Sequence, residues 1–218
     1  MTEDNDLQEL AEPVRERFAE RHEARETAYV ASRDVIRSAA NAIRALHRGE
    51  RDRAEELMTR SGERLAAAAG VAHPHPHVFY GGFLQDAMKE YAEARITAAV
   101  LDGADVPSPA DLDVDDASWL HGLSETVGEC RRACLDAIRS GDLERGEQLL
   151  GVMQEIMSVL VAIDVPDGLT RGLRRKADGA RAITERTRGD LTTAVGQREL
   201  RGALDAHREA LERSLDTG

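Results

Sequence analysis

Two segments of the sequence place pairs of glutamates one helical turn apart. Glu90 and Glu93 are separated by three positions, and Glu125 and Glu129 by four. Residues at these spacings share one face of a helix, where like charges repel unless a cation compensates them. Carboxylates are the ligands that hard divalent cations such as Mg²⁺ and Mn²⁺ prefer. If the two helices are neighbours, the four glutamates converge into a metal site suited to phosphodiester hydrolysis.

An alternative interpretation of these glutamates is a solvated surface. The chain holds 41 acidic residues, and such a number produces many pairs at these spacings by chance. Gly128, inside the second pair, lowers helix propensity, and its presence there predicts that another group approaches that turn closely.

A row of arginines follows one side of the first predicted helix. At about 100° per residue, four of them lie within about 60° of one another, opposite an apolar face. Guanidinium groups bind phosphate in a bidentate manner and keep their charge, which indicates a phosphate-binding surface. The alternative is that they pair with nearby acids. The four residues are Arg33, Arg37, Arg44 and Arg48.

A second basic cluster opens the last predicted helix. It comprises Arg171, Arg174, Arg175 and Lys176. Cations near a helix N-terminus oppose the helix dipole, so the cluster favours a purpose beyond helix stability, such as an extension of the phosphate-binding surface.

The elements that must position these residues are long helices. Aromatic residues make up 3% of the chain, Ala, Leu, Glu and Arg dominate, and no β-branched runs indicate strands. We predict an all-α bundle of about six or seven long antiparallel helices. It forms a single domain over residues 1–218, in which 195–218 is a C-terminal helical extension. The predicted helices are Leu7–Arg48, Asp52–Ala69, Val78–Leu101, Ser118–Arg139, Leu143–Ile163 and one from about Gly168 past Ala194, which Gln197–Leu215 either continues or folds back upon.

The charge balance limits the kinds of partner. The formal net charge is -12, so nucleic acid has to bind through a local basic patch. Of the 29 basic residues, 27 are arginine, and Lys89 and Lys176 are the two lysines. The acidic N-terminus does not read as a signal peptide and no apolar stretch is long enough for a membrane span, so we expect a cytoplasmic protein with no membrane partner.

The cysteines and a run of histidines are expected to be mainly structural. Cys130 and Cys134 lie one helical turn apart and are expected to be small, half-buried helix residues rather than a disulfide framework. His73, His75 and His77 alternate with prolines, which predicts an extended, stiff connector. A transition-metal site is the alternative for the three histidines.

Several motifs resemble those of the translin family. The segment 90–94, Glu-Tyr-Ala-Glu-Ala, looks like the Glu-Tyr-x-Glu-Ala motif of translin-associated factor X. The segment 122–129, Gly-Leu-Ser-Glu-Thr-Val-Gly-Glu, looks like its Gly-x-Ala-Asp-Leu-Thr-Gly-Glu motif. Similar residues stand in the family at Leu46-His47-Arg48, Ser140-Gly141-Asp142 and Leu173-Arg174-Arg175-Lys176, so the resemblance covers roughly residues 25 to 194.

This resemblance implies a helical bundle that assembles with copies of itself into a shell, usually an octamer, around single-stranded RNA or DNA. In the catalytic branch the acids at the positions of Glu90, Glu93, Glu125 and Glu129 bind a divalent metal, Mg²⁺ or Mn²⁺, and cleave RNA. Arg33, Arg37, Arg44, His47, Arg48, Arg174, Arg175 and Lys176 are then the residues expected to bind nucleic acid. Two departures bear on catalysis: Glu125 replaces an aspartate, and Lys89 replaces a frequent glutamine, so its ammonium group competes with a metal.

Three functions follow as hypotheses. The first is an oligomeric protein that binds single-stranded RNA or DNA. The second is a metal-dependent endoribonuclease that uses the four glutamates. The third is a non-catalytic helical scaffold that binds a protein partner, for which an exposed apolar stripe on Gln197–Leu215 would be the distinguishing feature.

Overall fold

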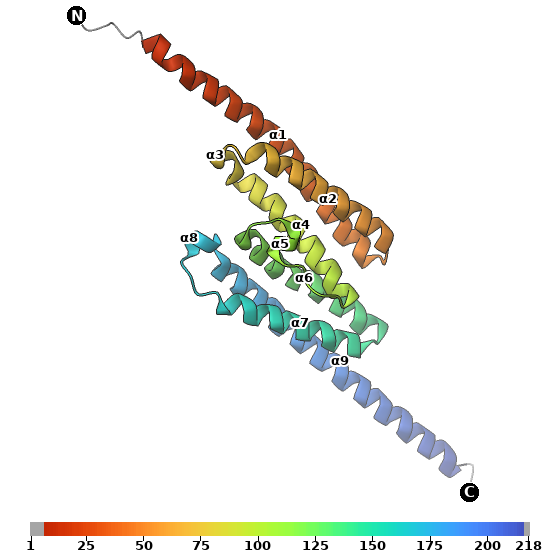
Figure 1. Cartoon of the computed structure of the whole chain (residues 1–218). Coiled ribbons are helices and arrows are strands. Elements are labelled where there is room, and N and C mark those ends of the chain that lie inside the picture. The colour runs from red at the N-terminus through yellow and green to blue at the C-terminus, as the bar shows by residue number, and fades with distance from the viewer. Residues whose placement is uncertain (1–6, 216–218) are drawn as a thin grey trace, which may run out of the picture. The chain divides into compact units, whose positions relative to one another are not determined.

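The computed structural model describes residues 7–215. Every element in that range is a helix, which confirms the all-α prediction (Figure 1). The chain divides between Leu123 and Ser124, inside α6, into two compact units. The helices are α1 Leu7–His47, α2 Arg51–Ala72, α3 Pro76–Phe79, α4 Gly82–Asp102, α5 Pro109–Leu112, α6 Asp116–Ser140, α7 Leu143–Ala162, α8 Asp167–Thr170 and α9 Leu173–Leu215.

In the first unit, α1, α2 and α4 pack against one another (Figure 1). Their shared core is built largely from alanine, and small side chains let helix backbones approach closely. The core comprises Ala39, Ala42, Ile43, Ala45, Leu46, Ala54, Met58 and Ala94. This packing explains how a chain with so few aromatic residues buries its helices.

Two glycines end long helices of this unit where the chain has to turn. Gly49, which follows α1, has a φ of 74°, and Gly103, which follows α4, has a φ of 68°. Only glycine adopts this left-handed conformation without strain from a Cβ atom. The sequence prediction for the end of the first helix is therefore correct to within one residue.

The segment 103–115 carries the chain back along α4 before α6 begins. Its 13 residues can span about 40 Å, more than the roughly 31 Å length of α4. Ser118 Oγ donates to the Gln85 carbonyl at 3.1 Å, and Gly122 lies against the backbone of Lys89 and Glu93. The first turns of α6 thus run parallel to α4. This pair of helices therefore departs from the predicted antiparallel arrangement.

The return segment is held by its own hydrogen bonds. Ser108 and Asp111 form a reciprocal capping box at the start of α5. The Trp119 indole Nε1 donates to the Pro107 carbonyl at 2.9 Å, which ties the segment to α6. These bonds hold the segment between α4 and α6 in a defined conformation.

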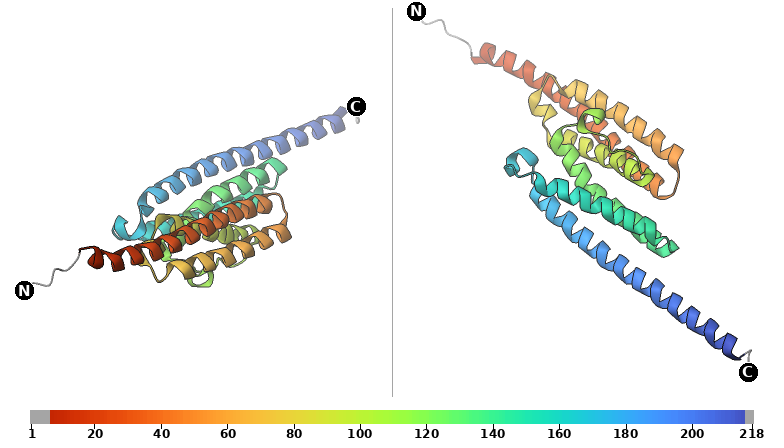
Figure 2. Two further views of the ribbon diagram at one scale, coloured as in Figure 1. Left: turned by 90° about the horizontal axis from the view of Figure 1, so that it is seen from above. Right: turned by 60° about the horizontal axis from the view of Figure 1, so that its bottom comes forward.

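In the second unit, α7 packs along α9 (Figure 2). Leu143, Leu150 and Leu191 form their apolar core. The helix α9 continues without a break to Leu215, so residues 195–215 extend it and do not fold back, and residues 216–218 of the predicted extension lie outside the described range. The single domain over residues 1–218 stays a prediction.

The histidine segment is not the extended connector that the sequence predicted. His77 lies inside the short helix α3, because Pro76 occupies its first position, where a missing N–H does no harm. Cys130 and Cys134 are free thiols, as expected, but both are fully buried, and burial raises the pKa of Cys130 to about 12. Across residues 7–215, no helix has the length and apolar character that a membrane crossing requires.

The contact at Gly122 makes a testable prediction about stability. A Cβ atom there would lie 2.9 Å from the Glu93 nitrogen and from the Lys89 oxygen, both backbone atoms that cannot rotate away. We expect Gly122→Ala to lower the free energy of unfolding by about 1–3 kcal/mol in urea titrations. The control is Gly128→Ala in the same helix, where nothing lies within 4 Å; alanine should be neutral or stabilising there by up to about 1 kcal/mol. Equal effects at both positions would contradict this account.

Candidate functional site

The first pair of glutamates lies on α4, in the first unit. Glu93 is 7% exposed, and Glu90 is half-buried. The Lys89 ammonium group forms an ion pair with Glu90 at 2.9 Å, and both side chains are largely shielded from solvent. A carboxylate as buried as that of Glu93 requires compensation by hydrogen bonds or cations, so this face of α4 is suited to holding positive charge.

Gly122 sets the place where α6 meets this face of α4. Its close contact with the backbone at Lys89 and Glu93 lies inside the first unit. The prediction that Gly128 marks a close approach is wrong, because nothing lies within 4 Å of the position a Cβ would take there. The glycine that the packing requires is the first residue of the motif, not the seventh.

The second pair of glutamates lies on α6, beyond this contact. The helix is continuous, so Glu125 lies one turn past Gly122 and within about 60° of it around the helix axis. Glu129 returns to within about 20° of Gly122, one further turn along. Both glutamate side chains are half-buried. In the second unit the Lys176 ammonium group pairs with Glu125 at 2.6 Å.

The arginines of α1 lie where the helical period places them. Arg33, Arg37 and Arg44 are exposed along α1, and Arg48 is exposed in the turn that follows it. Their opposite face, which includes Val35 and Ala39, is fully buried. The apolar and basic sides of this helix are therefore separated as the sequence predicted.

These arginines do not have equivalent partners. Arg37 pairs with Asp34 one turn away, and Arg48 binds both carboxylate oxygens of Glu50, which lowers the pKa of Glu50. Arg44 donates to the neutral side chain of Asn41. Pairing with nearby acids therefore applies to Arg37 and Arg48, whereas the partner of Arg44 is uncharged.

The second basic cluster is divided between two roles. Arg174 and Arg175 are exposed, and Arg174 lies 3.6 Å from Asp164 in a solvated ion pair of little energetic weight. Lys176 is instead directed at Glu125. Arg171, Arg174 and Arg175 are therefore exposed, whereas Lys176 faces a carboxylate, a difference that the sequence alone could not reveal.

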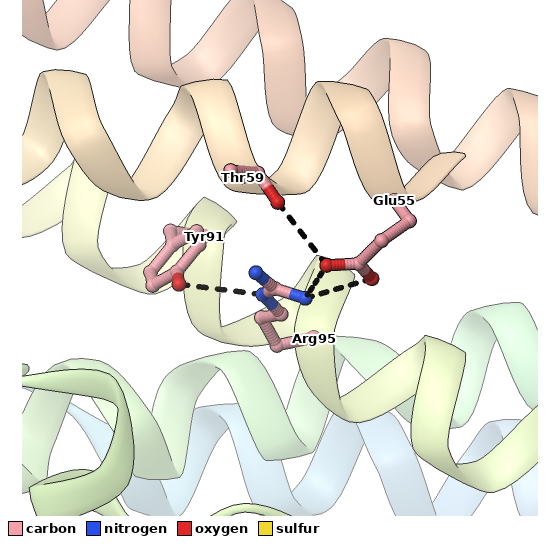
Figure 3. A network of polar contacts seen from close by, with 4 residues as sticks. All are labelled: Glu55, Thr59, Tyr91 and Arg95. Carbon is pink, nitrogen blue, oxygen red and sulfur yellow. Dashed lines mark hydrogen bonds and ion pairs between the residues drawn. The ribbon is translucent and has the colours of Figure 1, made fainter. Parts of the chain in front are cut away.

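A polar network that the sequence analysis did not single out ties α4 to α2 (Figure 3). The Arg95 guanidinium donates to both carboxylate oxygens of Glu55, at 2.8 and 2.9 Å, and its Nε donates to the Tyr91 hydroxyl at 3.3 Å. Thr59 also donates to Glu55, at 3.2 Å. Because Tyr91 and Arg95 flank Glu93 on α4, the network holds the helix that carries the first glutamate pair. No spacing rule joins α2 to α4, since the partners are 40 positions apart.

Several proteins of known structure are similar to this chain in sequence and fold. No family model matches the chain. A C3PO protein of Archaeoglobus, of which one structure is a complex with duplex RNA, is 31% identical, with a TM-score of 0.80 over 86% of this chain and 97% of that chain. A C3PO protein of Nematostella is 18% identical, with a TM-score of 0.76 over 89% and 100% of the two chains, which shows a common fold.

A curated protein of Methanocaldococcus jannaschii without an assigned function is 27% identical over 189 residues, which are 86% of this chain and 83% of that protein. The structural likenesses define the class as helical proteins of the C3PO, or translin, type. The chain belongs to the translin family.

The Arg95 network predicts a measurable contribution to stability. We expect Arg95→Met to lower the free energy of unfolding by about 1 kcal/mol, because it removes a partly shielded ion pair and a cation–π contact with Tyr91. The control is Arg53→Met, which removes a solvated pair with Glu56 within α2 and should cost no more than about 0.5 kcal/mol. Urea titrations at low and high salt measure both. Indistinguishable losses would mean that the network does not secure α4.

Proposed function

We propose that this protein binds RNA through the exposed arginines of α1 and through Arg174 and Arg175 at the start of α9, and that its glutamates hold a divalent metal for RNA cleavage. The observation that carries the proposal is the separation of charge in an acidic chain. Arg33, Arg37 and Arg44 line one exposed side of a single helix, whereas Glu90 and Glu93 lie on a shielded face of another. The related Archaeoglobus protein has been solved with duplex RNA, which supports RNA as the ligand.

The donor set supports a hard divalent cation. Glu90 and Glu93 on α4, and Glu125 and Glu129 one turn apart on α6, are carboxylates that can supply its oxygen ligands. Mg²⁺ and Mn²⁺ are the ions we propose, because both prefer carboxylate oxygens. When bound, such an ion activates water and neutralises charge on a phosphodiester. The glutamates orient the ion, and the arginines bind flanking phosphates without changing protonation state.

Assembly into a homo-oligomer is part of the proposal. A protein with a net charge of -12 repels nucleic acid as a whole, so a few arginines on one copy give weak binding. Several copies that present the same row to one RNA molecule multiply those contacts. Identical subunits are the simplest way to obtain such a surface.

A scaffold function is favoured by a different observation. Leu200, Leu204, Leu211 and Leu215 lie within about 60° of one another around α9, and each is at least half exposed. An apolar stripe of this kind suits the surface of another protein. A scaffold of this type would have no affinity for RNA, so the binding measurement below distinguishes the two functions.

Loss of the arginine row should weaken RNA binding in a salt-dependent way. For the triple variant R33Q/R37Q/R44Q we expect the slope of log affinity against log salt to decrease by about 2 for single-stranded RNA, since each lost phosphate contact removes about 0.7. Fluorescence anisotropy with single-stranded RNA, duplex RNA and single-stranded DNA measures this and ranks the three ligands.

The matched control for this experiment is R198Q/R201Q/R213Q on the exposed end of α9, which changes the net charge by the same amount. It should leave the salt slope nearly unchanged. If both triple variants weaken binding equally, general charge and not the row on α1 determines affinity.

Cleavage should depend on the buried glutamate. We expect the parent protein to cut single-stranded RNA with Mg²⁺ or Mn²⁺ and to be inactive with EDTA. Glu93→Gln preserves the side-chain volume but should reduce the rate by at least about 100-fold, because even indirect partners of a metal contribute 10- to 100-fold. Glu56→Gln, an exposed change on α2, is the control. Activity that survives in Glu93→Gln, or never appears in the parent, would remove the enzymatic part of the proposal.

A further inference from the structure

The two lysines of the chain have the same kind of partner. Lys89 pairs with Glu90 at 2.9 Å inside the first unit, and Lys176 pairs with Glu125 at 2.6 Å inside the second. Both glutamates belong to the proposed metal-binding set. With 27 arginines available as cations, the use of lysine at these two positions is specific to the candidate site.

Elsewhere arginine supplies the cation of comparable ion pairs. Arg95 binds Glu55 between α4 and α2, and Arg131 binds Asp190 between α6 and α9. A guanidinium group forms a planar fork that is held by several hydrogen bonds at once, whereas an ammonium group is a compact charge on a flexible stem. A lysine can therefore leave its carboxylate by simple rotation of its side chain, which makes it a cation that another cation can replace.

The surroundings of both pairs strengthen the interaction. The side chains of Lys89 and Glu90 are 18% and 23% exposed, and those of Lys176 and Glu125 are 37% and 24% exposed. Partial shielding from water makes the attraction between opposite charges larger than on an open surface. Each ammonium group thus neutralises a carboxylate that would otherwise be repelled by its neighbouring glutamate.

We propose that Lys89 and Lys176 are internal counter-cations that stabilise the glutamates in the metal-free protein, and that a divalent ion must displace them to bind. This inference rests on the proposed function, because it takes the glutamates as the metal ligands. The two lysines then determine metal affinity. At low metal concentration they neutralise the glutamates, and the protein binds the ion more weakly than a variant without the lysines would.

Titration of Mn²⁺ into the full-length protein by isothermal calorimetry, without RNA, tests this proposal. We compare the parent with Lys89→Gln, Lys176→Gln and the double variant. Each single change should tighten Mn²⁺ binding by about five- to tenfold, the size of one ion pair between partly shielded groups. The control is Arg188→Gln on α9, which removes a solvated pair with Glu185 and changes the net charge equally; its Mn²⁺ affinity should stay within about twofold of the parent.

Thermal unfolding supplies an independent readout. Without metal, both lysine variants should unfold at a lower temperature than the parent, because a carboxylate loses its counter-charge. Saturating Mn²⁺ should raise their unfolding temperature by more than it raises that of the parent. Adding Glu93→Gln to Lys176→Gln should abolish the gain in affinity.

The outcomes separate this inference from the proposed function. If the lysine variants bind Mn²⁺ no more tightly than the parent, the inference fails, while a metal site and cleavage can still stand. If neither the parent nor the double variant binds millimolar Mn²⁺, both the inference and the catalytic proposal fail. A gain in affinity that survives Glu93→Gln would place the ion elsewhere and would also overturn the inference.

Discussion

The contact between Gly122 and the backbone of α4 is the constraint on which the candidate site depends. A side chain at position 122 would meet backbone atoms of Lys89 and Glu93 at 2.9 Å, so only glycine allows the two helices to approach this closely. The contact fixes where α6 begins to run beside the first glutamate pair. Because α6 continues unbroken, its helical period places Glu125 within about 60° of Gly122 around the axis of α6.

The direction of the two helices follows from the return segment. If a tight turn followed Asp102, the first turns of α6 would run back along α4. The hydrogen bonds of Ser118 to Gln85 and of Trp119 to Pro107 show that the chain first returns and then runs the same way as α4. Within the first unit, the first turns of α6 therefore run in the same direction as α4.

Charge compensation is the second theme of the molecule. Lys89 pairs with Glu90 in the first unit and Lys176 pairs with Glu125 in the second, so each of the two lysines compensates one glutamate of the proposed metal-binding set. The arginines serve other purposes: Arg95 joins helices through a defined network, and the arginines of α1 remain exposed. The distinction matches the chemistry of the two cations, since guanidinium groups form rigid bidentate contacts and ammonium groups exchange more easily.

The sequence by itself determined the helical class, the approximate helix ends and the amphipathic character of α1, because helical period, alanine content and glycine positions are local properties. It also indicated Glu90, Glu93, Glu125 and Glu129 through their spacing and motifs. The tertiary structure decided that Gly122 and not Gly128 marks the close approach and that Lys176 faces a glutamate instead of solvent. It also revealed that Glu55 joins Arg95 across 40 positions. These features depend on which helices become neighbours and in which direction they run, and no local pattern in a single chain encodes that choice.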